Sequence, residues 1–194
     1  MIRIRLNGRG GQGGKTMAEL MATMYFGGGN EAGKYRYVSS APTFGPERRG
    51  SPVDAFIRLS QEPIRELGPF ANPDMVIVLD ESLTRVTDVT AGLNEGGLLL
   101  INSSQSPEAF ADYAKRFRVA TIDADAIAIS HELGTSATPI VNTTLLGAFV
   151  RVSGLGVTLD ALLGFIDTEI TKKIDENKKA AHEAFHAVVV RKEE

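Results

Sequence analysis

Residues 6–16, LNGRGGQGGKT, form a glycine-rich polar turn near the start of the chain. An alternating strand pattern at residues 2–6 precedes this turn, and an amphipathic helical pattern follows it at about residues 14–26. Gly8, Gly10 and Gly13 match the G-x-G-x-x-G pattern of dinucleotide-binding loops, whereas residues 14–16, Gly-Lys-Thr, match the end of a phosphate-binding P-loop. Both patterns place backbone N–H groups at a helix N-terminus, where an anionic phosphate is favoured.

The P-loop interpretation has a defect at its first position. The full pattern requires a glycine at position 9, and Arg9 stands there. The segment VIVLDES, residues 76–82, resembles the partner strand of an NTPase because its apolar run ends in Asp80 and Glu81, but many buried parallel strands end in this way. A P-loop NTPase therefore stays open as an alternative.

The dinucleotide interpretation fails further along the chain. It requires an acid at the end of the second strand for the ribose hydroxyls, yet the strand expected at residues 35–38 is followed by two serines, and Glu31 precedes that strand. Arg9 and Lys15 add positive charge to the loop, which suits a phosphate-rich ligand. The loop is therefore predicted to be an anion cradle. An NAD-dependent dehydrogenase, or a glycine turn that only packs a helix against a strand, also remains open.

Strand and helix patterns alternate over most of the chain, which predicts an open, mostly parallel, doubly wound α/β sheet with helices on both faces. A single domain, 1–194, is expected, with C-terminal helices at 158–191. Further strands are expected at about 35–38, 53–60, 75–79, 96–104 and 118–127, and further helices from Ser82, at 107–116 and at 138–155.

Composition narrows the possible functions. The formal net charge of −3 argues against a nucleic-acid partner, and no apolar run is long enough for a membrane span. The N-terminus lacks the features of a signal peptide, so a cytoplasmic protein is expected. The chain has no cysteine, which excludes thiolate-held iron–sulfur clusters on it. His182 and His186 match the H-E-x-x-H zinc pattern, but a solvated Lys-rich helix is favoured there and no metal site is expected.

The segment FGPERRGSP, residues 44–52, is a stiff loop that carries Glu47, Arg48 and Arg49. An exposed turn with a surface ion pair would explain these charges, but it would stabilise the fold little. Arginine is well suited to protein interfaces, so a protein–protein interface is the other interpretation, which the family resemblance described next favours.

The order of several motifs resembles the gamma subunit of the 2-oxoacid:acceptor oxidoreductases, which include pyruvate:ferredoxin oxidoreductase. The motifs are GRGGQGGKTMAELMA (8–22), PTFGPERRGSPVDAFIRLS (42–60), NPDMVIVLDESL (72–83), GGLLLINSS (96–104), DADAIA (123–128) and TPIVNTTLLGAFVRVSGL (138–155). The resemblance covers about residues 1–155, with a looser match in the C-terminal helices.

The resemblance implies a cytoplasmic enzyme complex of anaerobic metabolism that converts a 2-oxoacid and coenzyme A (CoA) into acyl-CoA, carbon dioxide and two electrons. Thiamine diphosphate, magnesium and iron–sulfur clusters would lie on partner alpha, beta and ferredoxin-like delta subunits, and the resemblance allows further electron-transfer subunits. The gamma chain would contribute CoA binding and subunit interfaces, would carry no catalytic residue, and would be inactive alone.

The resemblance also assigns roles to residues. It places Arg9, Gly10, Gly11 and Gly13 at the CoA phosphates, with Gly8 in the same loop, and it places Asn142 across the cleft as a hydrogen-bonding partner. Lys15 has no trusted counterpart in the family, so its role rests on its charge. By the same resemblance, the loop containing Glu47, Arg48 and Arg49 faces partner subunits.

Overall fold

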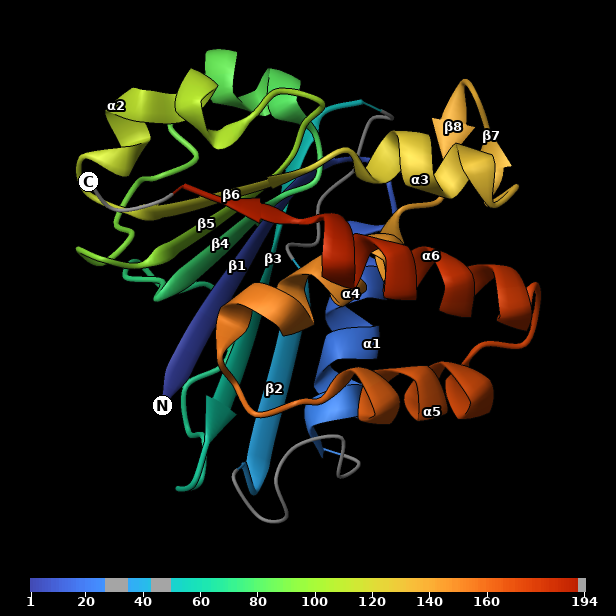
Figure 1. The fold of residues 1–194 in the computed structure, drawn as a ribbon. Coiled ribbons are helices and arrows are strands. Elements are labelled where there is room, and N and C mark those ends of the chain that lie inside the picture. Colours follow the sequence, from blue (N-terminus) through green and yellow to red (C-terminus); the bar gives the residue numbers. More distant parts are fainter. Residues whose placement is uncertain (27–34, 43–49, 192–194) are drawn as a thin grey trace.

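A seven-stranded mixed sheet forms the centre of the computed structural model, which describes residues 1–26, 35–42 and 50–191 (Figure 1). The strand order is β2-β3-β1-β4-β5-β6-β9. The strands are β1 (Ile2–Arg9), β2 (Tyr37–Pro42), β3 (Pro52–Ser60), β4 (Met75–Val78), β5 (Leu98–Asn102), β6 (Arg118–Ile122) and β9 (Val189–Val190). All except β3 and β9 run in one direction, since β3 is antiparallel to β1 and β2, and β9 is antiparallel to β6. The expected open, mostly parallel sheet is confirmed.

The central strand β4 shows why the apolar runs form this sheet. Met75 and Ile77 belong to the core on one face, whereas Val76 and Val78 belong to the core on the other. Alternate residues of a strand point to opposite faces, so a strand buried on both sides must be apolar at every position. The segment MVIV meets this requirement.

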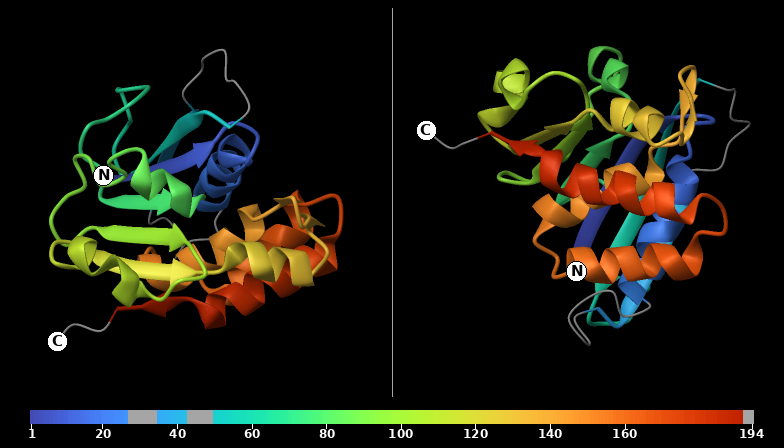
Figure 2. Two further views of the ribbon diagram at one scale, coloured as in Figure 1. Left: turned by 90° about the horizontal axis from the view of Figure 1, so that it is seen from above. Right: turned by 45° about the vertical axis from the view of Figure 1, so that its right-hand side comes forward.

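The two faces of the sheet are covered differently (Figures 1 and 2). The long helices α1 (Gly14–Phe26), α4 (Asn142–Ser153), α5 (Leu159–Glu169) and α6 (Ile174–Ala187) gather on one face. The other face carries short helical segments, namely η1 (Glu81–Arg85), η2 (Pro107–Phe110) and α2 (Ala111–Ala114). In the described ranges, no helix is long and apolar enough to cross a membrane.

Helix α4 lies in the middle of the helical layer, with eleven of its twelve residues buried. It packs closely on α6 at Gly147, where an added β-carbon would lie only 2.1 Å from the carbonyl oxygen of Ala181. Glycine is therefore required for this helix contact. The packing fixes the N-terminus of α4, at Asn142, relative to the rest of the helical layer.

The chain changes sides of the sheet between β1 and β4. The connection after β1 begins with α1 on one face, whereas the connection after β4 runs through η1 on the opposite face. β1 and β4 are neighbouring parallel strands, with Ile4 paired with Met75 and Asn7 with Val78. Such a point leaves a crevice beyond the carboxyl ends of the strands, where ligands bind in open α/β sheets.

Several element boundaries differ from those expected. The strand expected over 118–127 ends at Ile122, because the Asp123 carboxylate accepts the N–H of Ala126 and starts α3 (Ala124–Ser130). The second strand continues to Pro42, and the expected helix 107–116 divides into η2 and α2. A short hairpin of β7 (Gly134–Thr135) and β8 (Thr138–Pro139) precedes α4. The two C-terminal helices are present, and β9 follows them.

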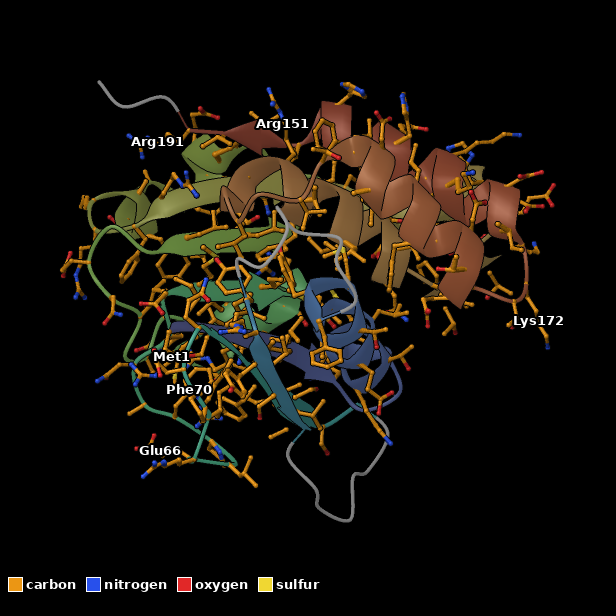
Figure 3. The ribbon with its side chains drawn as sticks, turned by 90° about the horizontal axis from the view of Figure 1, so that it is seen from below. Met1, Glu66, Phe70, Arg151, Lys172 and Arg191 are labelled. Atoms are coloured by element: carbon orange, nitrogen blue, oxygen red, sulfur yellow. The ribbon has the colours of Figure 1, made fainter. Side chains whose placement is uncertain are left out.

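A buried arginine holds the loop at the amino end of the sheet. Arg58 is 1% exposed and pairs with Arg3 across the strands β3 and β1. Its Nη1 donates to the carbonyl of Gly68 at 2.8 Å, and its guanidinium carbon lies 4.8 Å from the ring centroid of Phe70. Figure 3 looks onto this end, where Glu66 and Phe70 lie on the same side as Met1. The carboxyl end of β1, with the glycine loop, is therefore distant from it.

Candidate functional site

The glycine loop connects β1 to α1 in a conformation that depends on glycine. Gly11 and Gly13 have φ values of 93° and 79°, in the left-handed region that side chains disfavour. The Gly10 N–H donates to the carbonyl of Ser51 at 2.9 Å, and the Gly50 N–H donates to the carbonyl of Gly10 at 3.0 Å. These two bonds tie the loop to the segment that leads into β3.

Several N–H groups of this loop have no protein acceptor. Among the described residues, none accepts from the backbone N–H of Gly11, Gly13, Gly14 or Lys15. The first turn of α1 also lacks an acidic side chain that would offset the positive end of the helix. The loop therefore presents unpaired donors and a favourable potential for an anion.

A cavity of about 270 Å³ lies over these donors. Every residue of the loop that the sequence singled out lines it, namely Gly8, Arg9, Gly10, Gly11, Gly13 and Lys15. Lys15 also forms an exposed ion pair, in which its Nζ lies 3.7 Å from Oε1 of Glu19. The carboxylate of Asp54 completes the wall and accepts from Asn7 Nδ2 at 2.6 Å. Cations, an acid and the glycine loop thus line the same cavity.

Asn142 lies at the start of α4 and packs directly against the glycine loop. An added β-carbon at Gly13 would lie 2.9 Å from both Nδ2 and Oδ1 of Asn142. The residue is 9% exposed, and its Oδ1 is a buried acceptor with no partner in the described part of the chain. Buried polar groups are normally satisfied, so an unpaired amide beside unpaired N–H groups indicates a place for a polar ligand.

A hydrogen-bonded network crosses the crevice between β1 and β4. Asp80 follows β4, and its Oδ2 accepts from Arg9 Nε at 3.0 Å and from Gln12 Nε2 at 2.8 Å. Burial raises the pKa of the Asp80 carboxyl, but hydrogen bonds from Ser82 and Gln12 and the charge of Arg9 together hold this pKa below its ordinary value. Asp80 is therefore ionised at neutral pH and pairs with Arg9.

Sequence reasoning missed the role of Gln12 and gave Asp80 no role beyond a possible NTPase acid. Gln12 lies inside the glycine motif, but the motif specifies no residue type at that position. The available signal for Asp80 was the polar DES stretch after the apolar run of β4, at the edge where ligands bind.

A second cavity, of about 320 Å³, lies beyond the carboxyl ends of β4, β5 and β6. Four of its lining residues are acidic: Asp80, Glu81, Asp123 and Asp125. Gln12 lines it as well, so the glycine loop borders this acidic cavity on one side and the 270 Å³ cavity on the other. An anion is repelled from the acidic side and attracted to the loop side.

Two other features of the sequence lie outside the loop cavity or outside the described residues. Glu47, Arg48 and Arg49 fall outside the described residues. The H-E-x-x-H segment, residues 182–186, contains Glu183, and Oε2 of Glu183 lies 2.6 Å from Nε2 of His131. Across residues 1–26, 35–42 and 50–191, no three His, Cys, Asp or Glu side chains are grouped so that they could hold a metal ion.

Comparison with known proteins identifies the family. The model of the pyruvate ferredoxin/flavodoxin oxidoreductase family matches residues 3–187. A pyruvate synthase subunit PorC from Methanothermobacter marburgensis is 46% identical, over 95% of this chain and 96% of the relative. The common gamma subunit of the pyruvate/ketoisovalerate oxidoreductases from Thermococcus kodakarensis is 42% identical, over 98% of both chains.

A solved structure agrees with these relatives. The crystal structure of pyruvate oxidoreductase subunit PORC from Thermotoga maritima superposes with a TM-score of 0.77 at 31% identity and covers 98% of each chain. The comparisons do not support the alternative of a free-standing NTPase or dehydrogenase. The chain belongs to the pyruvate ferredoxin/flavodoxin oxidoreductase family and is a gamma-type subunit of one of its multisubunit enzymes.

Proposed function

We propose that this gamma subunit binds the phosphates of CoA on its glycine loop while the partner subunits carry out the redox chemistry. The observation that carries the proposal is the set of unpaired N–H groups of Gly11, Gly13, Gly14 and Lys15, with the unpaired amide of Asn142 beside them. A diphosphate offers several anionic acceptors to such donors.

The loop lacks an acid for the ribose hydroxyls and carries extra positive charge. Both features disfavour a simple dinucleotide and favour CoA. CoA carries a 3′-phosphate besides its diphosphate, so the additional charges of Arg9 and Lys15 are useful. Arginine has five N–H donors, and the bonds of Arg9 to Asp80, Ser82 and Gly50 leave one donor on each terminal nitrogen. The side-chain amide of Asn142 can donate to a phosphate or accept from an amide or hydroxyl of the ligand.

The neighbouring charges orient the ligand. The phosphates favour the loop cavity, whereas the acidic cavity beyond β4 to β6 repels them. The proposal thus places the phosphates of CoA on the loop side and away from the acidic cavity.

In the assembled enzyme, a 2-oxoacid and CoA would give acyl-CoA, carbon dioxide, two electrons and a proton. Thiamine diphosphate with magnesium would supply the decarboxylation chemistry, and iron–sulfur clusters would accept the electrons, on alpha, beta and ferredoxin-like delta subunits. The lack of cysteine in this chain fits that division. The gamma chain would hold CoA, contribute no catalytic side chain and be inactive alone.

The charged loop is proposed as a contact with these partners. Its described flanking residue Gly50 is bonded to Gly10, and the carbonyl of Gly50 accepts from Arg9. A partner that reaches Gly50 would therefore lie beside the CoA loop.

The test is equilibrium binding of CoA to the assembled complex, compared with ATP and NAD. The proposal predicts preference for CoA, and weaker CoA binding after Gly13→Ala or Asn142→Ala. Preference for ATP with magnesium, abolished by Lys15→Ala, would instead support a P-loop function. Turnover of a 2-oxoacid by the isolated chain would refute the proposed division of labour.

A further inference from the structure

Asp80 connects the two strands that border the ligand crevice. Its Oδ1 accepts from the N–H of Ser82 at 2.9 Å and from the Ser82 hydroxyl at 2.6 Å, which caps η1. Its Oδ2 faces the glycine loop and accepts from Arg9 Nε and Gln12 Nε2. One oxygen of the carboxylate therefore caps η1, and the other oxygen binds the glycine loop.

Gln12 extends this connection to the backbone of the loop. Its Nε2 donates to Asp80 at 2.8 Å, while its Oε1 accepts the backbone N–H of Arg9 at 2.7 Å. The guanidinium of Arg9 also donates from Nη2 to the Ser82 hydroxyl at 2.8 Å and from Nη1 to the carbonyl of Gly50 at 2.9 Å. The first residue of the loop is thus held through both its backbone and its side chain.

We propose that Asp80 is a positioning residue, which acts through Gln12 and Arg9 to hold the glycine loop in its phosphate-binding conformation. This inference rests on the proposed CoA-binding function. Asp80 does not need to touch the ligand. It fixes the end of β1 relative to β4, so that the unpaired N–H groups of Gly11, Gly13, Gly14 and Lys15 keep their positions beside the cavity before the ligand arrives. Such preorganisation lowers the entropy cost of binding.

A positioning role and simple electrostatics predict opposite changes in CoA binding when the charge of Asp80 is removed. A carboxylate close to a phosphate site repels the ligand, and it also consumes donors of Arg9. Removing its charge should then tighten CoA binding. If Asp80 positions the loop, removing the charge weakens CoA binding instead, because the conformation of the loop is lost.

Asp80→Asn separates these two effects. The asparagine Oδ1 can still accept from Ser82 and cap η1, but its Nδ2 then faces the donors Arg9 Nε and Gln12 Nε2. The variant therefore removes the link to the loop with almost no change in volume. In the assembled complex we expect the Kd and KM for CoA to rise about tenfold. The kcat at saturating CoA and the KM for the 2-oxoacid should be nearly unchanged.

Asp125→Asn is the matched control. Asp125 lines the acidic cavity with Asp80, and the asparagine can still accept from Asn102 Nδ2, the bond present at 3.0 Å. This variant removes a nearby negative charge and leaves the glycine loop intact. We expect an unchanged or slightly lower Kd for CoA.

Gln12→Met provides a second test if the Asp80→Asn complex does not assemble. It removes the link between the Arg9 backbone and Asp80 but leaves the carboxylate charge in place, and we again expect a higher Kd for CoA. If Gly13→Ala weakens CoA binding, then tighter or unchanged CoA binding in the assembled Asp80→Asn or Gln12→Met complex would overturn the positioning role. If Gly13→Ala and Asn142→Ala also leave CoA binding unchanged, the proposed function itself fails.

Discussion

The side-chain amide of Asn142 packs against the α-carbon of Gly13, so that residue 13 has no room for a β-carbon. The two residues are far apart in sequence and lie at the starts of α4 and α1. Their contact brings the N-terminus of a deeply buried helix to the loop with unpaired N–H groups. The close packing of α4 on α6 at Gly147 supports this arrangement.

Gly13→Ala tests this contact. The alanine would have to adopt a φ of 79°, and its methyl group would lie 2.9 Å from Asn142. We expect a loss of about 1–3 kcal/mol in the free energy of unfolding, together with weaker CoA binding. Gly96→Ala is a control for backbone strain alone, since φ is 72° there and no atom lies within 4 Å of the added carbon. It should destabilise the fold without affecting CoA binding, and equal CoA binding in both variants would contradict the account.

Asn142→Ala should separate binding from stability. The substitution removes a buried acceptor that has no partner, and such an unsatisfied group costs about 1–3 kcal/mol. The small cavity left behind offsets part of this gain. We expect a melting temperature close to that of the wild type and CoA binding weaker by about 0.5–1.5 kcal/mol. A large drop in melting temperature with unchanged CoA binding would instead show that Asn142 serves the fold.

Lys15→Ala should affect the ligand more than the fold. The Lys15–Glu19 ion pair is exposed, with side chains 63% and 56% accessible, and exposed pairs contribute little to stability. We expect a change of less than about 0.5 kcal/mol in the free energy of unfolding. CoA binding should weaken at low ionic strength and become less dependent on salt. Lys115→Ala, which breaks a comparable exposed pair with Asp112, is the control and should leave CoA binding unchanged.

The pKa of Asp80 gives a pH-dependent stability. Because folding lowers this pKa below its ordinary value of 3.8, the ionised carboxyl stabilises the fold above that pH, and the stabilisation is lost as the pH falls through the lowered pKa. The difference in the free energy of unfolding between wild type and Asp80→Asn should therefore be largest near neutral pH and shrink below about pH 4. A difference that stays constant from pH 7 to pH 3 in denaturant titrations would contradict this prediction.

Arg58→Lys tests the anchor at the opposite end of the sheet. Lysine keeps the charge but cannot reproduce the planar contact with Phe70 or the guanidinium hydrogen bond to Gly68. We expect a loss of about 1.5–3 kcal/mol in the free energy of unfolding. CoA binding by assembled complexes should be unaffected, because Arg58 pairs with Arg3 far from the carboxyl end of β1. A selective loss of CoA binding would show that the two ends of the sheet are coupled.

The sequence predicted the sheet because its central strands are buried on both faces. Continuous apolar segments such as residues 75–78 and 98–101 fit few other environments. It did not predict where β6 ends. Residues 118–127 continue the apolar pattern, and whether Asp123 lies in a strand or caps a helix depends on the hydrogen bond from Ala126.

The loop residues of the candidate site could also be predicted, but their connections could not. A glycine motif predicts local backbone geometry, so the six expected loop residues line one cavity. The contacts of Asp80 with Arg9 and Gln12 join segments about seventy residues apart, at 71 and 68 positions. The distance between such segments depends on the neighbouring positions of β1 and β4 in the sheet, which local patterns do not specify.

The most direct test of the central claim is a structure of the assembled enzyme with CoA bound. The account predicts phosphate oxygens within hydrogen-bond distance of the backbone N–H groups of Gly11, Gly13, Gly14 or Lys15, with the Asp80–Gln12 bond intact. CoA phosphates bound away from this loop, with the cavity beside Gly13 containing no part of the ligand, would contradict it.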